Sequence, residues 1–303
     1  MSGRSIFTRP ARIAAIAPYG WMVLFFLVPF VFVLKLSLSQ TAIAQPPYEP
    51  VFDLSAGWDA IMAAFAALSF DNFRLLVSDS LYLSAGLRSL VVAATATAVL
   101  ALIGYPIAYA MARLPRRWQP LAMMLVIIPF WTSFLIRVYA WINILQHDGL
   151  LNQILMSLHI VSAPVVWLAT DTAMYIGMVY SYLPFMILPL YATLTKLDSS
   201  LLEAAADLGS SPLQAFWRVT FPLSLPGVGA GVLLCFIPLV GEFVIPDLLA
   251  GSEAMMVGQT LWLEFFTNRD WPVAAATAVL LLLILLVPLL LYDRFQRRQM
   301  GRP

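Results

Sequence analysis

The sequence predicts an all-α integral membrane protein with six transmembrane helices, and three observations support this prediction. Hydrophobic residues make up 61% of the 303 residues, charged residues make up only 11%, and the mean hydropathy is +0.87. A soluble domain of this size could not keep so much apolar surface away from water, so lipid must solvate much of the chain. The apolar residues also gather in long segments separated by polar connections.

Six segments are long and apolar enough to cross a bilayer, which takes roughly 20 residues. In chain order they are 16–38, 82–112, 119–145, 172–195, 224–248 and 272–292. Because hydrocarbon offers the backbone no hydrogen-bond partners, each segment is predicted to be a helix. The alternating pattern of a membrane β-barrel is missing from these segments.

The segments outside the spans divide the chain further. We expect a basic tail over 1–15, an outer loop over 39–81, a core over 82–293 that includes a loop at 199–222, and a second basic tail over 294–303. Within the outer loop, the apolar stretch 60–70 is too short to cross. We expect it to form a short helix that lies on the membrane surface or packs on the outer side.

The distribution of charge predicts the orientation. Of the 17 basic residues, 12 lie in the tails and in the connections after the second and fourth spans: Arg4, Arg9, Arg12, Arg113, Arg116, Arg117, Lys196, Arg218, Arg294, Arg297, Arg298 and Arg302. Basic residues near span ends favour the cytoplasmic side. Both termini and the loop 199–222 are therefore expected in the cytoplasm. The net charge of +1 points to no particular kind of partner, and we expect no nucleic-acid partner.

The loop 199–222 has the signals of two short helices joined by a turn. Ser200 and Glu203 have the spacing of a capping box, which would start the first helix, and Gly209 would end it in a left-handed conformation. Ser211 would cap a second helix that has Pro212 at its first position, and Pro222 would stop it. Four apolar side chains of this loop need cover from membrane helices or from a partner: Leu201, Leu202, Leu213 and Phe216.

The stretches "EAAADLG" and "VTFP" in this loop resemble the cytoplasmic loop of permease subunits of binding-protein-dependent ABC importers. Glu203, the two alanines after it, Gly209 and Pro222 match the family pattern, while Val219 and Phe221 are mild departures. The resemblance implies the type I importer permease fold, with a coupling helix between the fourth and fifth helices that seats on an ATPase subunit. The residues implied in this coupling are Glu203, Ala204, Ala205, Asp207, Gly209 and Pro212.

The resemblance also implies partners. ATP hydrolysis of the usual kind needs a glycine-rich loop that ends in Gly-Lys-Ser/Thr, and neither Lys35 nor Lys196 follows a glycine. We therefore expect no enzyme activity and no bound cofactor here, with ATP and Mg on a separate ATPase dimer. The other expected partners are a second homologous permease and a soluble extracytoplasmic binding protein. We expect the chain to lie in the lipid of a bacterial inner membrane.

Four other stretches resemble permeases of polyamine importers, the putrescine type above all: "PFWTSFLIRVYAW" at 129–141, "VGEFVIPDLLAG" at 240–251, "NRDWPVA" at 268–274 and "IAQPPYEP" at 43–50. The resemblance implies import of putrescine. Three alternatives remain: the same architecture carrying spermidine, an amino acid derivative, an iron chelate or an oxyanion; an ion channel subunit; and an intramembrane enzyme. The spans contain no nucleophile–base pair that would favour the enzyme.

The chemistry of a cationic cargo selects candidate pathway residues. Glu242 is a charged residue within a span, between Pro238 and Pro246, where the helix is expected to break. Asp247 could meet the cargo nearer the outer mouth. Aromatic rings attract cations, which adds Trp131, Tyr139, Trp141, Tyr182 and Phe185 to the candidates. The alternative is that these aromatic residues anchor helices at the membrane interface.

The remaining reactive residues are assigned to structure. Arg137 would repel a cation, so we expect it in a structural or gating ion pair, for which Glu242 is the available partner. Cys235, the only cysteine, is expected to be a packing residue. His147 and His159 are twelve residues apart with no cysteine nearby, so no metal site is predicted.

Overall fold

The computed structural model describes residues 18–52, 57–251 and 255–300, so the predicted basic tail over 1–15 lies outside the described residues. The chain forms two compact units. One comprises Met1–Ser80 with Leu261–Leu283, and the other comprises Leu81–Thr260 with Ile284–Pro303. The predicted tail over 294–303 is instead helical as far as Met300, because the helix Trp271–Met300 (α15) continues through it.

The first unit begins with a candidate membrane span, Pro18–Ser37, which contains the π-helical turn η1 (Val23–Leu27) and the helix α2 (Val28–Ser37). A small antiparallel ladder of β1 (Gln40–Thr41) and β2 (Tyr48–Glu49) follows, so the fold is not purely helical. Leu36, Tyr48 and Ala275 form the buried core of this unit. The η4 turn (Leu263–Thr267) also belongs to it.

The segment 39–81, which we predicted to be an outer loop, contains two further helices, α3 (Trp58–Ala66) and α4 (Asp71–Ser78). Residues 58–78 together are long and apolar enough to qualify as a membrane span. However, the backbone leaves the helical form between the two, and they have only 9 and 8 residues. The short helix predicted within 60–70 is therefore present, with its start at Trp58.

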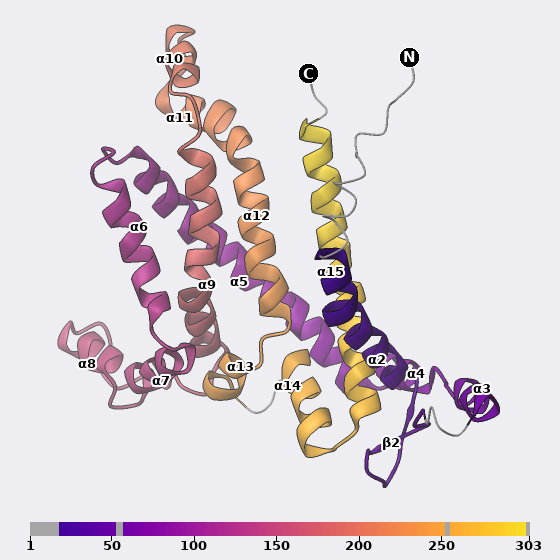
Figure 1. Ribbon diagram of the computed structural model, residues 1–303. Coiled ribbons are helices and arrows are strands. Elements are labelled where there is room, and N and C mark those ends of the chain that lie inside the picture. Colours follow the sequence, from indigo (N-terminus) through magenta and orange to yellow (C-terminus); the bar gives the residue numbers. More distant parts are fainter. Residues whose placement is uncertain (1–17, 53–56, 252–254, 301–303) are drawn as a thin grey trace, which may run out of the picture. The chain divides into compact units, whose positions relative to one another are not determined.

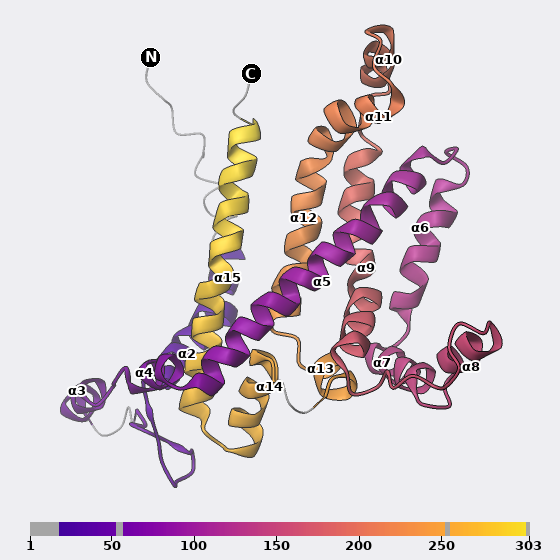
Figure 2. The same cartoon turned by 180° about the vertical axis from the view of Figure 1, so that it is seen from behind.

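The second unit contains the other long helices (Figure 1). In chain order its elements are α5 (Ser80–Arg113), α6 (Gln119–Ile127), η2 (Ile128–Trp131), α7 (Phe134–Leu145), α8 (Leu150–Ser157), α9 (Asp171–Leu194), α10 (Ser200–Asp207), α11 (Pro212–Ala215), η3 (Phe216–Thr220), α12 (Phe221–Val240), α13 (Val244–Leu249) and α14 (Val257–Trp262). Figures 1 and 2 show α5 crossing α9 and α12 obliquely, with α10 and α11 at one end of this group and α7 and α13 at the other.

The third predicted span, 119–145, is not a straight helix. It consists of Gln119–Trp131 and a second helical segment from Phe134, with a 90° bend between them. Pro129 lies in the tight η2 turn and has no N–H to donate, and Thr132 is extended with its hydroxyl bonded to the Pro129 carbonyl at 2.7 Å. The backbone therefore turns here instead of continuing across.

Small residues allow α9 and α12 to pack closely. A Cβ added at Gly227 would lie 2.5 Å from Thr193 Oγ1, and one at Gly231 would lie 2.7 Å from Met186 Sδ. Only glycine fits at such distances, so these two positions fix the approach of the helices. The fifth predicted span, 224–248, is interrupted: α12 ends at Val240, and a break precedes α13.

Candidate functional site

The loop that joins α9 to α12 is a compact helix–turn–helix (Figure 1). Gly209 has φ +81°, and its N–H bonds the carbonyl of Ala206 at 2.8 Å, which confirms its role in ending α10. Ser211 accepts a hydrogen bond from the backbone of Gln214, whose side chain accepts one from the Ser211 backbone. This capping box, with Pro212 at the start of α11, also agrees with the prediction.

The start of α10 differs from the prediction. The Ser200 side chain does not cap the helix; instead the carboxylate of Asp198 accepts the Ser200 N–H at 3.0 Å. The hydrogen bonds from Ser200 lower the pKa of Asp198, because they stabilise its ionised form. An aspartate two residues before the helix therefore accepts the Ser200 N–H, which the predicted box would have paired with the side chain of Glu203.

Pro222 does not stop the second helix, contrary to the prediction. Residues Pro212–Val240 form one continuous helical rod of 29 residues, which includes the π-helical turn η3. In that turn the N–H of Phe221 bonds the carbonyl of Phe216, five residues back. This wider turn, together with the place of Pro222 in the first turn of α12, leaves room for a ring that has no N–H.

The loop presents its motif residues to the outside. Glu203, Ala204, Asp207, Gly209 and Pro212 are exposed, whereas Ala205 is buried. Four large apolar side chains are exposed around them: Leu201, Leu208, Leu213 and Trp217. Leu208 and Trp217 were missed from the sequence, although a large apolar residue outside any span is itself a signal of a contact surface.

Phe216, by contrast, is covered by the neighbouring helix α5. Its ring packs edge-on against Tyr105 at 5.8 Å and Tyr109 at 5.5 Å between centroids. The Tyr105 hydroxyl lies 2.9 Å from the Ser224 hydroxyl of α12. The prediction that a membrane helix covers part of this loop is thus confirmed for Phe216. The loop contacts α5 near the start of the helical segment Pro212–Val240.

The far end of the rod carries Glu242, in the break between α12 and α13. Its carboxylate accepts hydrogen bonds from the backbone N–H of Val244 at 3.1 Å, from that of Ile245 at 3.4 Å, and from the hydroxyl of Tyr182. Only 8% of Glu242 is exposed. The predicted broken helix is confirmed, and the carboxylate itself caps the helix that follows the break.

Arg137 and Glu242 form no ion pair in the part of the chain that the structure describes, so the expected pairing is wrong for this chain alone. The Arg137 guanidinium lies over two rings instead, 4.7 Å from the centroid of Phe130 and 5.7 Å from that of Phe134. The partners of Glu242 are instead Tyr182 and two backbone donors.

The predicted pathway residues fall into two groups. Tyr182 and Phe185 lie next to each other near Glu242, and Phe130, which sequence reasoning missed, packs edge-on against Phe185 at 5.0 Å. Trp131 and Tyr139 are exposed on the surface of the chain, Asp247 is exposed in α13, and Trp141 packs against Tyr180. The structure thus brings together Tyr182, Phe185 and Glu242 but not the other four.

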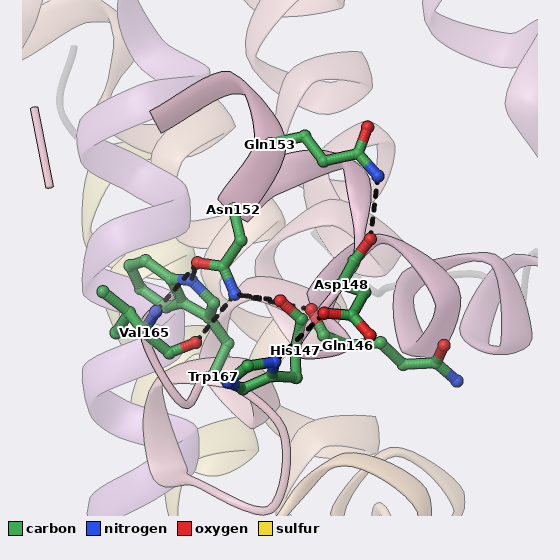
Figure 3. A network of polar contacts seen from close by, with 7 residues as sticks. All are labelled: Gln146, His147, Asp148, Asn152, Gln153, Val165 and Trp167. Carbon is green, nitrogen blue, oxygen red and sulfur yellow. Dashed lines mark hydrogen bonds and ion pairs between the residues drawn. The ribbon is translucent and has the colours of Figure 1, made fainter. Parts of the chain in front are cut away.

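The segment after α7 is held by the buried Asn152 (Figure 3). Its amide nitrogen donates to the carbonyls of Gln146, His147 and Val165, and its oxygen accepts from the Val165 N–H and the Trp167 indole. His147 meets only Asp148 among side chains drawn there, at 3.1 Å. One amide therefore shapes a polar end of the unit that sequence reasoning did not identify.

Comparison with known proteins relates these features to a family. The family described as "Binding-protein-dependent transport system inner membrane component" matches residues 101–300. The spermidine/putrescine transport system permease protein PotB of Escherichia coli strain K12 is 42% identical over 237 residues, which cover 78% of this chain and 86% of that protein. PotB of Haemophilus influenzae is 37% identical over 276 residues, covering 91% and 90%.

Solved structures share the fold at lower identity. A chain of a bacterial alginate ABC transporter, in complex with an alginate pentasaccharide-bound periplasmic protein, has a TM-score of 0.69 at 16% identity and covers 96% of this chain and 94% of its own. A chain of the inward-facing MetNI methionine ABC transporter has a TM-score of 0.55 at 18% identity, with coverage of 72% and 95%.

Proposed function

Because the chain belongs to the family of inner membrane components of binding-protein-dependent transport systems, we propose that it is the permease subunit of a polyamine importer, with putrescine as its main cargo. The predicted type I ABC importer fold is confirmed by its structural relatives, and the chain is a multi-pass membrane transport subunit, not an enzyme. The names of the PotB relatives support a polyamine cargo. The choice of putrescine rests on the resemblance of the quoted stretches.

One observation supports the coupling mechanism above all others: the continuous rod Pro212–Val240. A straight helix of this length spans about 40 Å. One end lies in the loop with the family motif, and the other end meets the break that holds Glu242. A displacement of the loop by a partner would therefore reach the break, because unbroken helical backbone joins the two.

We assign the loop to an ATPase partner. Its exposed motif residues and its exposed Leu208, Leu213 and Trp217 offer an apolar surface of the kind that a groove on a soluble subunit would bury. ATP and Mg would reside on that partner. The distribution of basic residues supports a cytoplasmic location for the loop and both termini. Closure of an ATPase dimer would pull on the loop and switch the pathway between its two accessible sides.

The cargo would pass near Tyr182, Phe185 and Glu242. Putrescine carries an ammonium group at each end of a short apolar chain, so it suits a path with aromatic faces and carboxylates. Asp247, which is exposed beyond the break, would be met first by a cation delivered from the outer side. A second homologous permease would supply the other wall, and a soluble binding protein would deliver the cargo.

Transport by the reconstituted complex tests this proposal. The chain is assembled in proteoliposomes with the ATPase, second permease and binding protein encoded beside it, and radiolabelled putrescine uptake is measured with and without ATP. The control complex carries an ATPase that binds but does not hydrolyse ATP. We expect uptake to depend on ATP. We also expect unlabelled putrescine to inhibit the uptake of the radiolabel more strongly than spermidine does. Uptake of a different solute only, or an ATP-independent conductance in the purified chain, would contradict the proposal.

A further inference from the structure

Helix α3 has one face of large apolar side chains that stay largely exposed, although the Phe65 ring contacts that of Phe52 at 4.8 Å between centroids. Trp58, Met62 and Phe65 are 73%, 54% and 55% exposed. At 100° per residue their positions fall within a narrow arc of the helix surface. The other exposed residues of the helix are Asp59 and alanines, which lie outside this arc.

Hydrogen bonds fix the level of this helix relative to the first span. The Ser69 N–H, just after α3, bonds the carbonyl of Leu38 at 2.9 Å. The Asn72 side-chain amide, in α4, donates to the carbonyls of Ser37 at 2.9 Å and Ser39 at 2.7 Å. These carbonyls belong to the end of α2, where no further helical turn would satisfy them. The segment is thus tied to the residues at which the first span leaves the membrane.

We propose that α3 lies in the membrane interface, parallel to the bilayer plane, with Trp58, Met62 and Phe65 inserted among the lipids of the leaflet that α2 exits. The exposed apolar side chains of α2 face the bilayer as part of a spanning helix. The apolar face of α3 would extend this lipid-facing surface. A tryptophan in the first turn of the helix suits the interface, because its ring has both an apolar part and a polar N–H.

The charge of α3 specifies how it binds lipid. Interfacial helices commonly use lysine and arginine to attract anionic headgroups. This helix has no basic residue, and Asp59 is its only charged side chain. The attachment therefore depends on apolar insertion and not on headgroup charge, so it should be insensitive to the anionic lipid content and to salt.

The alternative of a spanning helix conflicts with the same contacts. Residues 58–78 are apolar enough to cross, but crossing would need one continuous helix through 67–70. The backbone there is non-helical, and the Ser69 N–H donates a hydrogen bond to the carbonyl of Leu38. A second occupant, a partner protein lying over the face, is distinguished by the experiment below.

Spin labels on opposite faces of α3 test the proposal in the full chain reconstituted in nanodiscs. In a Cys235→Ala background, which removes the only cysteine, single cysteines are introduced at Met62 and, as matched controls, at Ala60 and Ala63 on the other side of the helix. Collision with dissolved oxygen reports lipid exposure, and collision with a water-soluble nickel chelate reports water exposure.

We expect the label at Met62 to favour oxygen, at a depth of about 5–10 Å below the headgroups, and the labels at Ala60 and Ala63 to favour the chelate. The result should be the same with and without anionic lipid. Chelate access on both faces would overturn the proposal. So would labels on both faces at the depth of the bilayer centre, which would indicate a span, or protection of Met62 from both reagents, which would indicate a protein cover.

Discussion

The hydroxyl of Tyr182 in α9 donates a hydrogen bond to the carboxylate of Glu242, 60 residues further along the chain. Both residues are buried, at 9% and 8% exposure. The contact ties the middle of α9 to the break at the end of α12, where the continuous rod from the loop ends. Since a buried charge is costly without partners, this pair stabilises the break that the proposed mechanism moves.

The Tyr182→Phe substitution removes one of the three donors to a buried carboxylate. We expect a loss of about 1–3 kcal/mol in the free energy of unfolding, measured by thermal unfolding of the purified chain in nanodiscs. Tyr180→Phe is the control, because Tyr180 packs on Trp141 and its hydroxyl makes no hydrogen bond within the described residues. Equal effects of the two substitutions would mean that the Glu242 contact contributes nothing.

Glu242→Gln separates charge from helix capping. The amide oxygen can still accept the N–H groups of Val244 and Ile245, while the negative charge is lost. If Glu242 meets the cationic cargo, the KM for putrescine should rise about tenfold, equivalent to roughly 1.4 kcal/mol, with basal ATPase activity unchanged. Asp247→Asn gives the same comparison at an exposed carboxylate. Unaltered uptake and unaltered spermidine competition in Glu242→Gln would remove Glu242 from the pathway.

Gly209 tests whether the turn of the loop couples hydrolysis to transport. At φ +81° a β-branched residue costs about 1–2 kcal/mol, whereas asparagine tolerates this conformation. No atom lies within 4 Å of an added Cβ, so the effect is one of backbone strain alone. We expect Gly209→Val to lower the putrescine transported per ATP hydrolysed, and Gly209→Asn to stay close to wild type.

The stronger variant, Gly209→Pro, also removes the N–H that bonds Ala206. It should abolish transport while the ATPase still co-purifies with the chain. Normal uptake by both Gly209→Val and Gly209→Pro would show that the left-handed turn is not needed for coupling.

Gly227 tests the close approach of α9 and α12. An added Cβ would lie 2.5 Å from Thr193 Oγ1 and 3.0 Å from the Pro189 carbonyl, which cannot move away easily. We expect Gly227→Ala to destabilise the chain by about 1–3 kcal/mol. Gly86→Ala in α5 is the control, because its Cβ would meet nothing within 4 Å, and alanine favours a helix there. A neutral Gly227→Ala would indicate that the helices can separate freely.

Asn152 tests the polar segment after α7 that Figure 3 shows. Asn152→Leu keeps the approximate shape but leaves buried backbone groups and the Trp167 indole without partners. A loss of at least about 3 kcal/mol is expected, read out as faster protease cleavage between α7 and α9. Gln153→Ala loses one exposed hydrogen bond to Asp148 and should be neutral. Equal resistance of the two variants to protease would contradict this role.

Local signals in the sequence predicted much of the loop. Gly209, Ser211 and Pro212 act on the backbone within a few residues, so their roles do not depend on the rest of the fold. Pro222 was misread for the complementary reason. Whether a proline ends a helix depends on the turn before it, and here that turn is the π-helical η3, whose first residue, Phe216, packs on Tyr105 and Tyr109 of α5.

The candidate pathway shows the same division. The sequence identified Glu242 and the expected break, because a charged residue between two prolines in an apolar segment can be recognised without the fold. The partners of Glu242 are Tyr182 and two backbone donors instead of Arg137. These contacts depend on which side chains the fold brings close together. The 90° bend that interrupts the third predicted span also depends on the fold.

The amino-acid sequence by itself determined that this chain is embedded in lipid. It also determined the positions of most long helices and the loop that carries the family motif, because hydropathy, capping and turn residues act locally. The tertiary structure alone decided that the loop and the Glu242 break are the two ends of one helical rod, and that Arg137 rests on aromatic rings. Such relationships depend on packing between residues far apart in the chain, which no single segment of the sequence specifies.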